Sequence, residues 1–460
     1  MCLKSVTLWK SGSNLTKGII ISRVRCSRGS QSIGSVVENQ GVIEEVTIYA
    51  ATLDNPRTAD AHIHRALDYA TTFKRPVYLE IPRDQVYADI EETDYRSPSV
   101  KHTQPDSLAE ALAETLEMLE QAVSPVILAG IEVHRFGLED KLLALAEKLG
   151  VPVSSTMLGK SVFPEGHPHY IGIYNGKAGE PDQRKLVEES DCLLMLGTFL
   201  TDINMGMFTA QLDPARTIYA TSERIAIKHH EYPNVRFEDF ISALSSSPKL
   251  PHHDPSGITP MKPRVAPCEG KISMNSLLYE LNQFIDSNKL LVLDVGDTLF
   301  AADDIQMKDG TSFLCPAFYA SMGFGIPGTI GAQVAEPSQR AIALVGDGAF
   351  QMTGMELLTA KRLGLNLIVI VINNGSFASL RAMGHQDASF VNIPSIDYAQ
   401  FAEVLGGCGV VVETSEQFRQ GLRVAQESNT FSILDVRLLP DDVSPALQRL
   451  SDLFAKSLKG

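Results

Sequence analysis

Two short polar turns, each at the end of an apolar stretch, hold residues that could bind a metal ion. Gly346-Asp347-Gly348 follows the apolar run Ala341–Val345. Asn373-Asn374 follows the run Leu367–Ile372. We expect both runs to be buried parallel strands joined by a right-handed helical crossover, which brings their carboxyl ends to one edge of a sheet. Neighbouring strands lie about 4.8 Å apart, so Asp347 and Asn374 would lie within reach of one ion.

The residue types at this edge favour Mg²⁺. Asp347 offers a carboxylate oxygen, Asn374 an amide oxygen and Ser376 a backbone carbonyl oxygen, and Mg²⁺ prefers such oxygen ligands. Phosphate oxygens and water would complete the octahedron, and the flanking Gly346 and Gly348 would let a diphosphate approach the backbone closely. Either turn alone would be an ordinary tight turn. The pair, with each turn closing a buried strand, predicts a metal and diphosphate site.

This pair of turns resembles the Gly-Asp-Gly…Asn-Asn signature of thiamine-diphosphate-dependent enzymes. The resemblance implies thiamine diphosphate and Mg²⁺ as cofactors, with Asp347, Asn374 and Ser376 as metal ligands. It also implies contacts to the cofactor from three further segments of the chain. These are Gly296, Asp297 and Thr298 in an upstream turn, Ala320 through its carbonyl group, Met322 as support for the bent cofactor, and Gly346, Gly348 and Ala349 at the diphosphate.

A second glycine pattern, Gly323-Phe-Gly-Ile-Pro-Gly328, matches the dinucleotide fingerprint in letters only. No buried strand precedes it, and no acidic residue about twenty positions on closes a βαβ unit that it would open, as that fingerprint requires. We predict instead a helix whose first turn contains Pro327.

Within the family, the resemblance is closest to the 2-oxo acid decarboxylases of the phenylpyruvate/indolepyruvate type. It rests on residues 346–354, 373–381 and 437–456. Pyruvate decarboxylases place a catalytic Glu where this chain has Leu380. The resemblance therefore implies that Leu380, with Phe377, lines a pocket for a bulky or aromatic 2-oxo acid, which would lose CO₂ and leave as an aldehyde. The alternative for Leu380 is an ordinary core position.

No catalytic residue is identified in this chain. The family's activating Glu and its His pair belong to the first part of the pyrimidine-binding domain, and residues 1–45 do not match that part. The only acids there are Glu38, Glu44 and Glu45. Two alternatives to an active decarboxylase therefore stay open: an inactive or regulatory cofactor-binding remnant, and a carboligase similar to acetohydroxyacid synthases.

The elements that must position these residues indicate a multi-domain α/β protein, with parallel sheets flanked by helices. Short β-favouring runs alternate with amphipathic helices from about residue 46 onward. The resemblance implies a thiamine-diphosphate-binding fold together with a Rossmann-like middle domain. We expect a basic leader (1–40), the end of a pyrimidine-binding domain (41–95), a middle domain (105–245), a proline-rich linker (246–271), a diphosphate-binding domain (272–440) and a C-terminal helix (441–460).

Composition limits the partners. Lys+Arg 40 against Asp+Glu 55 gives a net charge of −15, which disfavours nucleic acid and anionic membranes. No apolar run is long enough to span a membrane, and the six scattered cysteines never form a CxxC pair. We expect a cytoplasmic homodimer or homotetramer with reduced thiols. The basic leader has two interpretations, a transit peptide for organellar import and an unstructured stretch, of which we favour the second.

Overall fold

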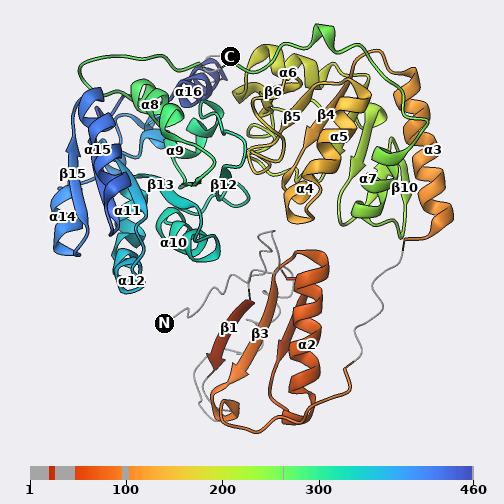
Figure 1. Cartoon of the computed structure of the whole chain (residues 1–460), viewed down its shortest axis with the longest axis horizontal. Coiled ribbons are helices and arrows are strands. Elements are labelled where there is room, and N and C mark those ends of the chain that lie inside the picture. The colour runs from red at the N-terminus through yellow and green to blue at the C-terminus, as the bar shows by residue number, and fades with distance from the viewer. Residues whose placement is uncertain (1–19, 26–46, 96–102, 263, 458–460) are drawn as a thin grey trace. The chain divides into compact units, whose positions relative to one another are not determined.

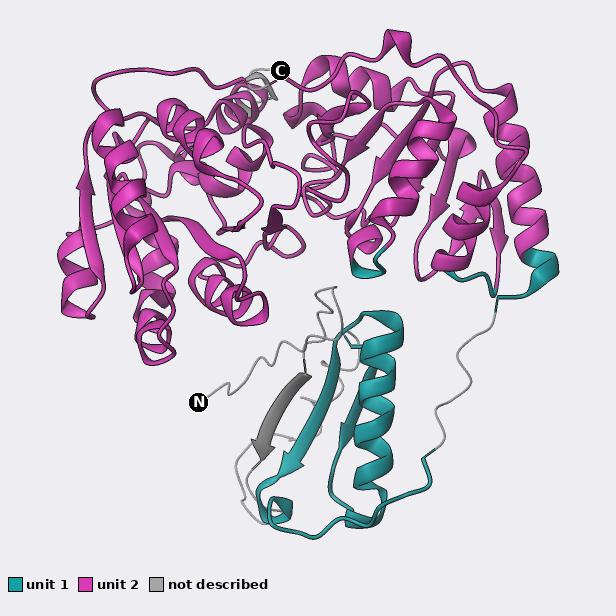
Figure 2. Ribbon diagram, viewed as in Figure 1, with its two compact units in different colours: residues 1–107, 135–137, 234–236 teal, residues 108–134, 138–233, 237–460 magenta. Residues whose placement is uncertain are grey.

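A computed structural model describes residues 20–25, 47–95, 103–262 and 264–457 (Figure 1). The chain forms two compact units (Figure 2). Unit 1 comprises residues 1–107, 135–137 and 234–236, and unit 2 comprises the remainder. Two further sheets define a central region (residues 105–245), which belongs to unit 2 except for residues 105–107, 135–137 and 234–236, and a C-terminal region (residues 272–440) within unit 2.

Unit 1 contains a parallel three-stranded sheet in the order β1-β3-β2. Its elements are β1 (Ile20–Arg25), β2 (Tyr49–Thr52), α2 (Pro56–Phe73) and β3 (Val77–Pro82). Asn55 caps α2 by accepting a hydrogen bond from the Arg57 N–H. The β2–α2–β3 unit confirms the prediction for this segment. Strand β1 was not predicted, because no apolar alternation marks it within the basic leader.

The central region is built on a seven-stranded sheet in the order β10-β9-β8-β7-β4-β5-β6. The strands are β4 (Pro125–Ala129), β5 (Val153–Ser155), β6 (Tyr170–Ile173), β7 (Cys192–Leu196), β8 (Thr217–Ala220), β9 (Ile225–Ile227) and β10 (His230–Tyr232). The helices are α3 (Pro105–Gln121), α4 (Ile131–Arg135), α5 (Glu139–Leu149), α6 (Pro181–Glu188) and α7 (Phe237–Ser246). The predicted parallel sheet is confirmed from β8 to β6, whereas β9 and β10 add an antiparallel edge. Strands β9 and β10 were not predicted, because three residues at a sheet edge carry too little alternation to be recognised in this sequence.

The C-terminal region has a six-stranded, wholly parallel sheet in the order β12-β11-β13-β14-β16-β15. The strands are β11 (Lys289–Leu293), β12 (Ser312–Leu314), β13 (Arg340–Gly346), β14 (Ile368–Asn373), β15 (Cys408–Val412) and β16 (Ser432–Arg437). The main helices are α8 (Met274–Phe284), α9 (Asp297–Phe300), α10 (Gly325–Ala335), α11 (Asp347–Thr353), α12 (Leu357–Arg362), α14 (Tyr398–Val404), α15 (Ser415–Glu427) and α16 (Pro445–Ser457).

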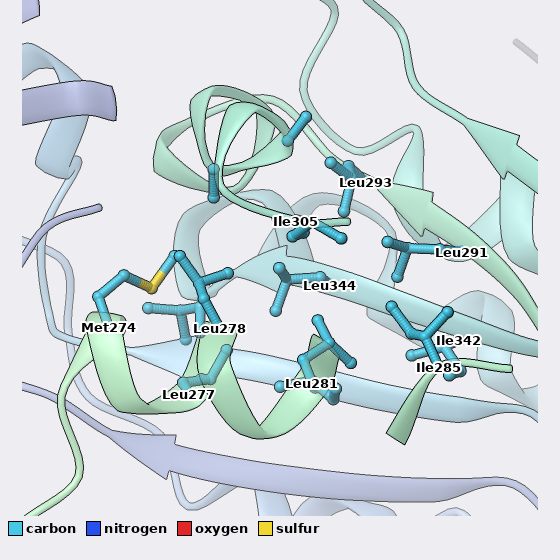
Figure 3. Packing of buried hydrophobic residues seen from close by; sticks show 14 of the residues in the cluster. Met274, Leu277, Leu278, Leu281, Ile285, Leu291, Leu293, Ile305, Ile342 and Leu344 are labelled. Atoms are coloured by element: carbon cyan, nitrogen blue, oxygen red, sulfur yellow. The ribbon is translucent and has the colours of Figure 1, made fainter. Parts of the chain in front are cut away.

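Both faces of this sheet are buried, as the apolar run in β14 predicts. Ile368, Ile370 and Ile372 belong to one cluster, which also contains residues of α8 and α15. Figure 3 shows part of this cluster, where α8 packs on the strands. Val369 and Val371 belong to a second cluster, which contains residues of α10, α12 and α14. Alternate side chains of one strand therefore support helices on opposite faces.

The helix after Gly346-Asp347-Gly348 differs from the prediction. The sequence predicts one helix over about 353–363, but α11 begins at Asp347 itself. Thr353 then leaves helical geometry (φ −138°, ψ 7°), and α12 follows after a short turn. Asp347 is therefore the first residue of a helix, and the N–H groups that follow it belong to a helix N-terminus.

The proline-rich linker carries one short 3₁₀ turn, Pro255–Gly257, among its described residues. Backbone hydrogen bonds anchor it along its length. The His253 N–H donates to the Leu149 carbonyl (2.7 Å), the Met261 N–H to the Tyr170 carbonyl (2.8 Å) and the Ser415 N–H to the Gly270 carbonyl (3.0 Å). The linker is thus laid along both regions of unit 2.

Two expectations from composition can be compared with the structure. Cys192, Cys268, Cys315 and Cys408 are free thiols. Within the described ranges, no helix has the length and apolar content that crossing a membrane requires.

Candidate cofactor and metal site

The structure brings Asp347 and Asn374 together, as their spacing predicts. Strands β13 and β14 are parallel neighbours, with Gly346 opposite Ile372. Asp347 is 2% exposed. One carboxylate oxygen accepts the N–H groups of Gly375 (2.7 Å) and Asn374 (3.2 Å), and the other accepts that of Gly348 (2.8 Å). Asp347 therefore fixes the turn after β14 to the start of α11.

The turn after β14 presents two further oxygen-bearing side chains. The Asn374 side-chain oxygen accepts the Ser376 N–H (3.1 Å), and both residues are buried. The Ser376 hydroxyl has no hydrogen-bond partner among the described residues. A buried hydroxyl without a partner costs free energy, so this position suits an added ligand. The sequence predicts only the Ser376 carbonyl as a ligand, and the structure adds the hydroxyl.

The electrostatics of Asp347 are compatible with a cation. Burial raises the pKa of Asp347 to about 6, and the backbone N–H groups that it binds only partly offset this effect. A neighbouring divalent cation would favour the ionised carboxylate. No group of three or more His, Cys, Asp or Glu that could hold a metal occurs in the part of the chain that is described. A site with one carboxylate, one amide and one serine fits a Mg²⁺ ion that also binds phosphate oxygens.

Gly348 shapes the wall next to the metal residues. A Cβ atom at this position would lie 2.4 Å from Phe377 Cε1 and 2.8 Å from Ile393 Cδ1. The absence of a side chain therefore lets the Phe377 ring pack against the start of α11. Ala349, the next residue, is buried. Leu380 is 39% exposed, so the alternative that it is an ordinary core residue is wrong.

The upstream turn has its side chains engaged inside the protein. Gly296 precedes α9 with φ +126°, a conformation that favours glycine. The Asp297 carboxylate accepts the Ser444 N–H (2.9 Å) and hydroxyl (2.5 Å). The Thr298 hydroxyl donates to the Asp294 carbonyl (2.9 Å). The side chains of Asp297 and Thr298 are thus hydrogen-bonded within the protein.

Asp294, at the end of β11, organises the segment around Ala320 and Met322. One of its carboxylate oxygens accepts the Gly323 N–H (3.0 Å) and the other accepts the Gly325 N–H (2.6 Å). Ala320 has a left-handed backbone (φ +58°) and Met322 is half-buried. The N–H groups of the Gly-x-Gly pattern are thus bound within the protein, in agreement with our rejection of a dinucleotide site. The sequence analysis missed Asp294, whose only signal is an acid at the end of an apolar run.

Asp435 is a second residue that the sequence analysis missed. It is fully buried in β16 and accepts a hydrogen bond from the Asn373 side-chain amide (2.7 Å), which also donates to the Ile396 carbonyl (3.0 Å). Of the two consecutive Asn residues, Asn373 therefore holds the strand end and Asn374 borders the candidate metal site. A single acid inside an apolar strand gives no spacing pattern from which this pairing could be predicted.

The buried carboxyl groups near α9 predict a pH-dependent stability. Burial raises the pKa of Asp297 to about 7 from its ordinary value of 3.8. Burial, reinforced by the neighbouring Asp303, raises the pKa of Asp304 to about 6. Between pH 3.8 and the raised pKa of each group, the folded protein keeps a proton that the unfolded chain has lost. The free energy of unfolding therefore falls as the pH rises through this range. We expect these two carboxyl groups to make the unfolding free energy about 4–6 kcal/mol lower at pH 8 than at pH 4.

Urea unfolding across this pH range measures the effect. Asp297→Asn should flatten the dependence, whereas Asn at the exposed Asp309 should leave it unchanged. An Asp297→Asn protein with the wild-type pH profile would contradict the assignment of the effect to this carboxyl.

Comparison with known families agrees with this architecture. Residues 294–436 match the C-terminal TPP-binding domain of thiamine pyrophosphate enzymes. Residues 112–242 match the central domain of the same enzymes. The first range includes Asp294, the candidate metal residues and Asp435, and the second range covers most of the seven-stranded sheet.

Three curated relatives extend the comparison. The chain is 35% identical over 430 residues to an indole-3-pyruvate decarboxylase of Azospirillum brasilense, covering 91% of this chain and 76% of that protein. It is 29% identical to an alpha-keto-acid decarboxylase of Mycolicibacterium paratuberculosis, covering 79% of this chain and 65% of that protein. It is 25% identical to a probable pyruvate decarboxylase of Schizosaccharomyces pombe, covering 88% and 73%. Together with both domain matches, these relatives show that the chain belongs to the thiamine-diphosphate-dependent 2-oxo acid decarboxylase family.

Proposed function

We propose that the protein catalyses the Mg²⁺-dependent, non-oxidative decarboxylation of a bulky or aromatic 2-oxo acid to an aldehyde. The observation that carries the proposal is the meeting of Asp347 and Asn374 at two neighbouring strand ends, beside the partnerless hydroxyl of Ser376. Similarity to the indole-3-pyruvate decarboxylase of Azospirillum brasilense supports an aromatic substrate. The chain spans about three quarters of that relative's length.

In this proposal, Asp347, Asn374 and Ser376 hold Mg²⁺, and the backbone of Gly346, Gly348 and Ala349 borders the diphosphate. Bound thiamine diphosphate supplies a nucleophilic carbon and an electron sink for the loss of CO₂. Gly346 and Gly348, which carry no side chains, would let the diphosphate approach the backbone closely.

A second group of residues would shape the other side of the cofactor. Asp294 holds the segment that carries Ala320 and Met322 through its bonds to two backbone N–H groups. Gly296 would contribute backbone groups, because the Asp297 and Thr298 side chains are engaged elsewhere. These residues orient the cofactor and take no part in proton transfer.

The two side chains that we assign to the substrate pocket, Phe377 and Leu380, are apolar. Phe377 packs against Gly348, and Leu380 stands partly exposed one helical turn later in the chain. Neither side chain can ionise, so this wall favours an aryl or long alkyl group over the methyl group of pyruvate. We further propose a cytoplasmic homodimer or homotetramer, as the family resemblance implies.

One observation favours a second candidate function, that of a cofactor-binding subunit without its own turnover. The carboxylates described at the site, Asp294, Asp297 and Asp347, all accept hydrogen bonds from backbone N–H groups. None of them is free to exchange a proton with the cofactor ring. A group that does so would come from elsewhere in the assembly.

Aldehyde formation separates the two candidates. The full chain is mixed with thiamine diphosphate, Mg²⁺ and phenylpyruvate, and the aldehyde is followed by coupled reduction. We expect kcat/KM for phenylpyruvate to exceed that for pyruvate by about 100-fold, because an apolar wall gains free energy from the larger side chain.

A thermal-shift assay with the same cofactors provides the second readout. Stabilisation by cofactor without aldehyde would favour the cofactor-binding subunit. An absence of both stabilisation and turnover would contradict the site itself. A protein that prefers pyruvate would contradict the assignment of an aromatic substrate.

A further inference from the structure

The first turn of α16 is bound by two buried carboxylates. Ser444, at its N-terminus, is fully buried and donates its N–H and hydroxyl groups to Asp297. The Ala446 N–H donates to the carboxylate of Asp304 (3.0 Å). The Ser444 hydroxyl in turn accepts the Leu447 N–H (3.1 Å). Backbone N–H groups that a helix start leaves unpaired are thus satisfied, and carboxylates are favoured at this end of the helix dipole.

A second part of α16 contacts the segment that follows the candidate metal loop. The Ser451 hydroxyl donates to the Ala382 carbonyl (2.8 Å). Just before the helix, Asp441 forms an ion pair with Arg381 (2.9 Å). A shared apolar cluster adds to these contacts. It contains Phe300 from α9, Ala378 from the segment after the metal loop, and Ala446, Leu447 and Leu450 from α16.

Helix α16 therefore bonds to both borders of the candidate site. One border is the Gly296-Asp297-Thr298 turn, and the other is the segment from Asn374 to Ala382. An apolar helix end could have filled this space without burying charge. Buried carboxylates require hydrogen bonds of fixed geometry to offset their lost hydration, so this contact specifies position as well as packing.

We propose that Asp297 is a positioning residue that acts through Ser444, an inference that rests on the proposed function. Its carboxylate locks α16 in place, and α16 holds the metal loop at the correct distance from the Gly296 turn. This role is given to the Asp297 side chain, within the turn that the resemblance places next to the cofactor. We call the Asp297–Ser444 contact the α16 clasp.

Hydrogen exchange of the cofactor-free protein tests the clasp directly. In Asp297→Ala and in Ser444→Ala, we expect the amides of residues 375–385 to exchange about tenfold faster than in the wild type, since a lost clasp allows local opening. In the doubly substituted protein the two effects should be less than additive, because both substitutions break the Asp297–Ser444 contact, while Ser444→Ala also removes the acceptor of the Leu447 N–H. Asp297→Asn, which keeps a hydrogen-bond acceptor, should restore part of the protection.

Cofactor affinity provides a second readout. With Mg²⁺ saturating, we expect the Kd for thiamine diphosphate to rise about tenfold in Asp297→Ala, again with a less than additive effect in the double variant. Gln448→Ala is the matched control, because it breaks only an exposed contact to Asp452 within the same helix. It should leave both the exchange rates and the Kd at wild-type values.

Exchange that increases in α16 but not in residues 375–385 would overturn the proposal, as would additive effects of the two single substitutions. A wild-type protein that fails to bind thiamine diphosphate would instead overturn the proposed function. The exchange measurement then still decides whether the clasp connects the two segments.

Discussion

Asp347→Ala should abolish Mg²⁺-dependent binding of thiamine diphosphate. Asp347 supplies the carboxylate that follows β13 beside the end of β14, and its oxygens also fix the backbone of Asn374 and Gly375. Removal of the carboxylate takes away a charged ligand of the ion and releases the turn that carries the other ligands. We expect the Kd for the cofactor to rise about 100-fold or more by isothermal titration calorimetry.

Two further variants make this result specific. Asn374→Ala removes an amide oxygen and leaves the carboxylate in place, so we expect a smaller rise of about tenfold. Asp309→Ala removes an exposed carboxylate of the same region and should leave the Kd unchanged. Cofactor binding of wild-type strength in folded Asp347→Ala protein would show that the metal site lies elsewhere.

Lys160→Met should strongly destabilise unit 2. Lys160 and Glu165 form an ion pair whose two side chains are fully buried, with a separation of 2.9 Å. Lys160 also donates to the Ile305 carbonyl (2.7 Å), and Glu165 accepts the Met307 N–H (2.9 Å). The substitution leaves Glu165 buried without its counter-charge, which costs about 3–5 kcal/mol in comparable pairs. Urea unfolding should show this loss as a lower midpoint.

The double variant Lys160→Met with Glu165→Leu should recover about half of the loss, because no charge is then left buried. Recovery is incomplete because the backbone groups of Ile305 and Met307 lose their partners. Lys185→Met is the matched control. It breaks an exposed pair with Glu189, and such pairs contribute about 0–1 kcal/mol. Equal effects of Lys160→Met and Lys185→Met would contradict the importance of burial.

The strands of the fold were predicted well wherever their residues are continuously apolar. The run that forms β14 is buried on both faces of a parallel sheet. Such a strand can be predicted from its own apolar residues, without knowledge of the strands that pair with it. Strands β9, β10 and β12 are three residues long, and β1 lies in a basic segment, so local composition could not reveal them. Their formation depends on neighbours that are distant in sequence.

The residues of the candidate site likewise include some that local sequence could predict and some that it could not. Asp347 and Asn374 could be predicted because each stands at the end of a recognisable strand, and topology brings such ends together. Asp294, Asp435 and Ser444 could not, because their partners are backbone or side-chain groups from other elements. The turn that carries Asp297 was predicted to contact the cofactor, but the sequence did not indicate that the Asp297 side chain accepts hydrogen bonds from Ser444, far along the chain.

The anchored linker has a consequence for the thermodynamics of unit 2. Six prolines between Ser245 and Lys271 restrict the unfolded chain, so fixing this segment costs less conformational entropy than a glycine-rich connection would. Its hydrogen bonds to Leu149, Tyr170 and Ser415 then divide one long connection into short closed loops. The linker therefore restricts the central and C-terminal regions more than a flexible connection of the same length would. If its hydrogen bonds were lost, the two regions would unfold more independently of each other.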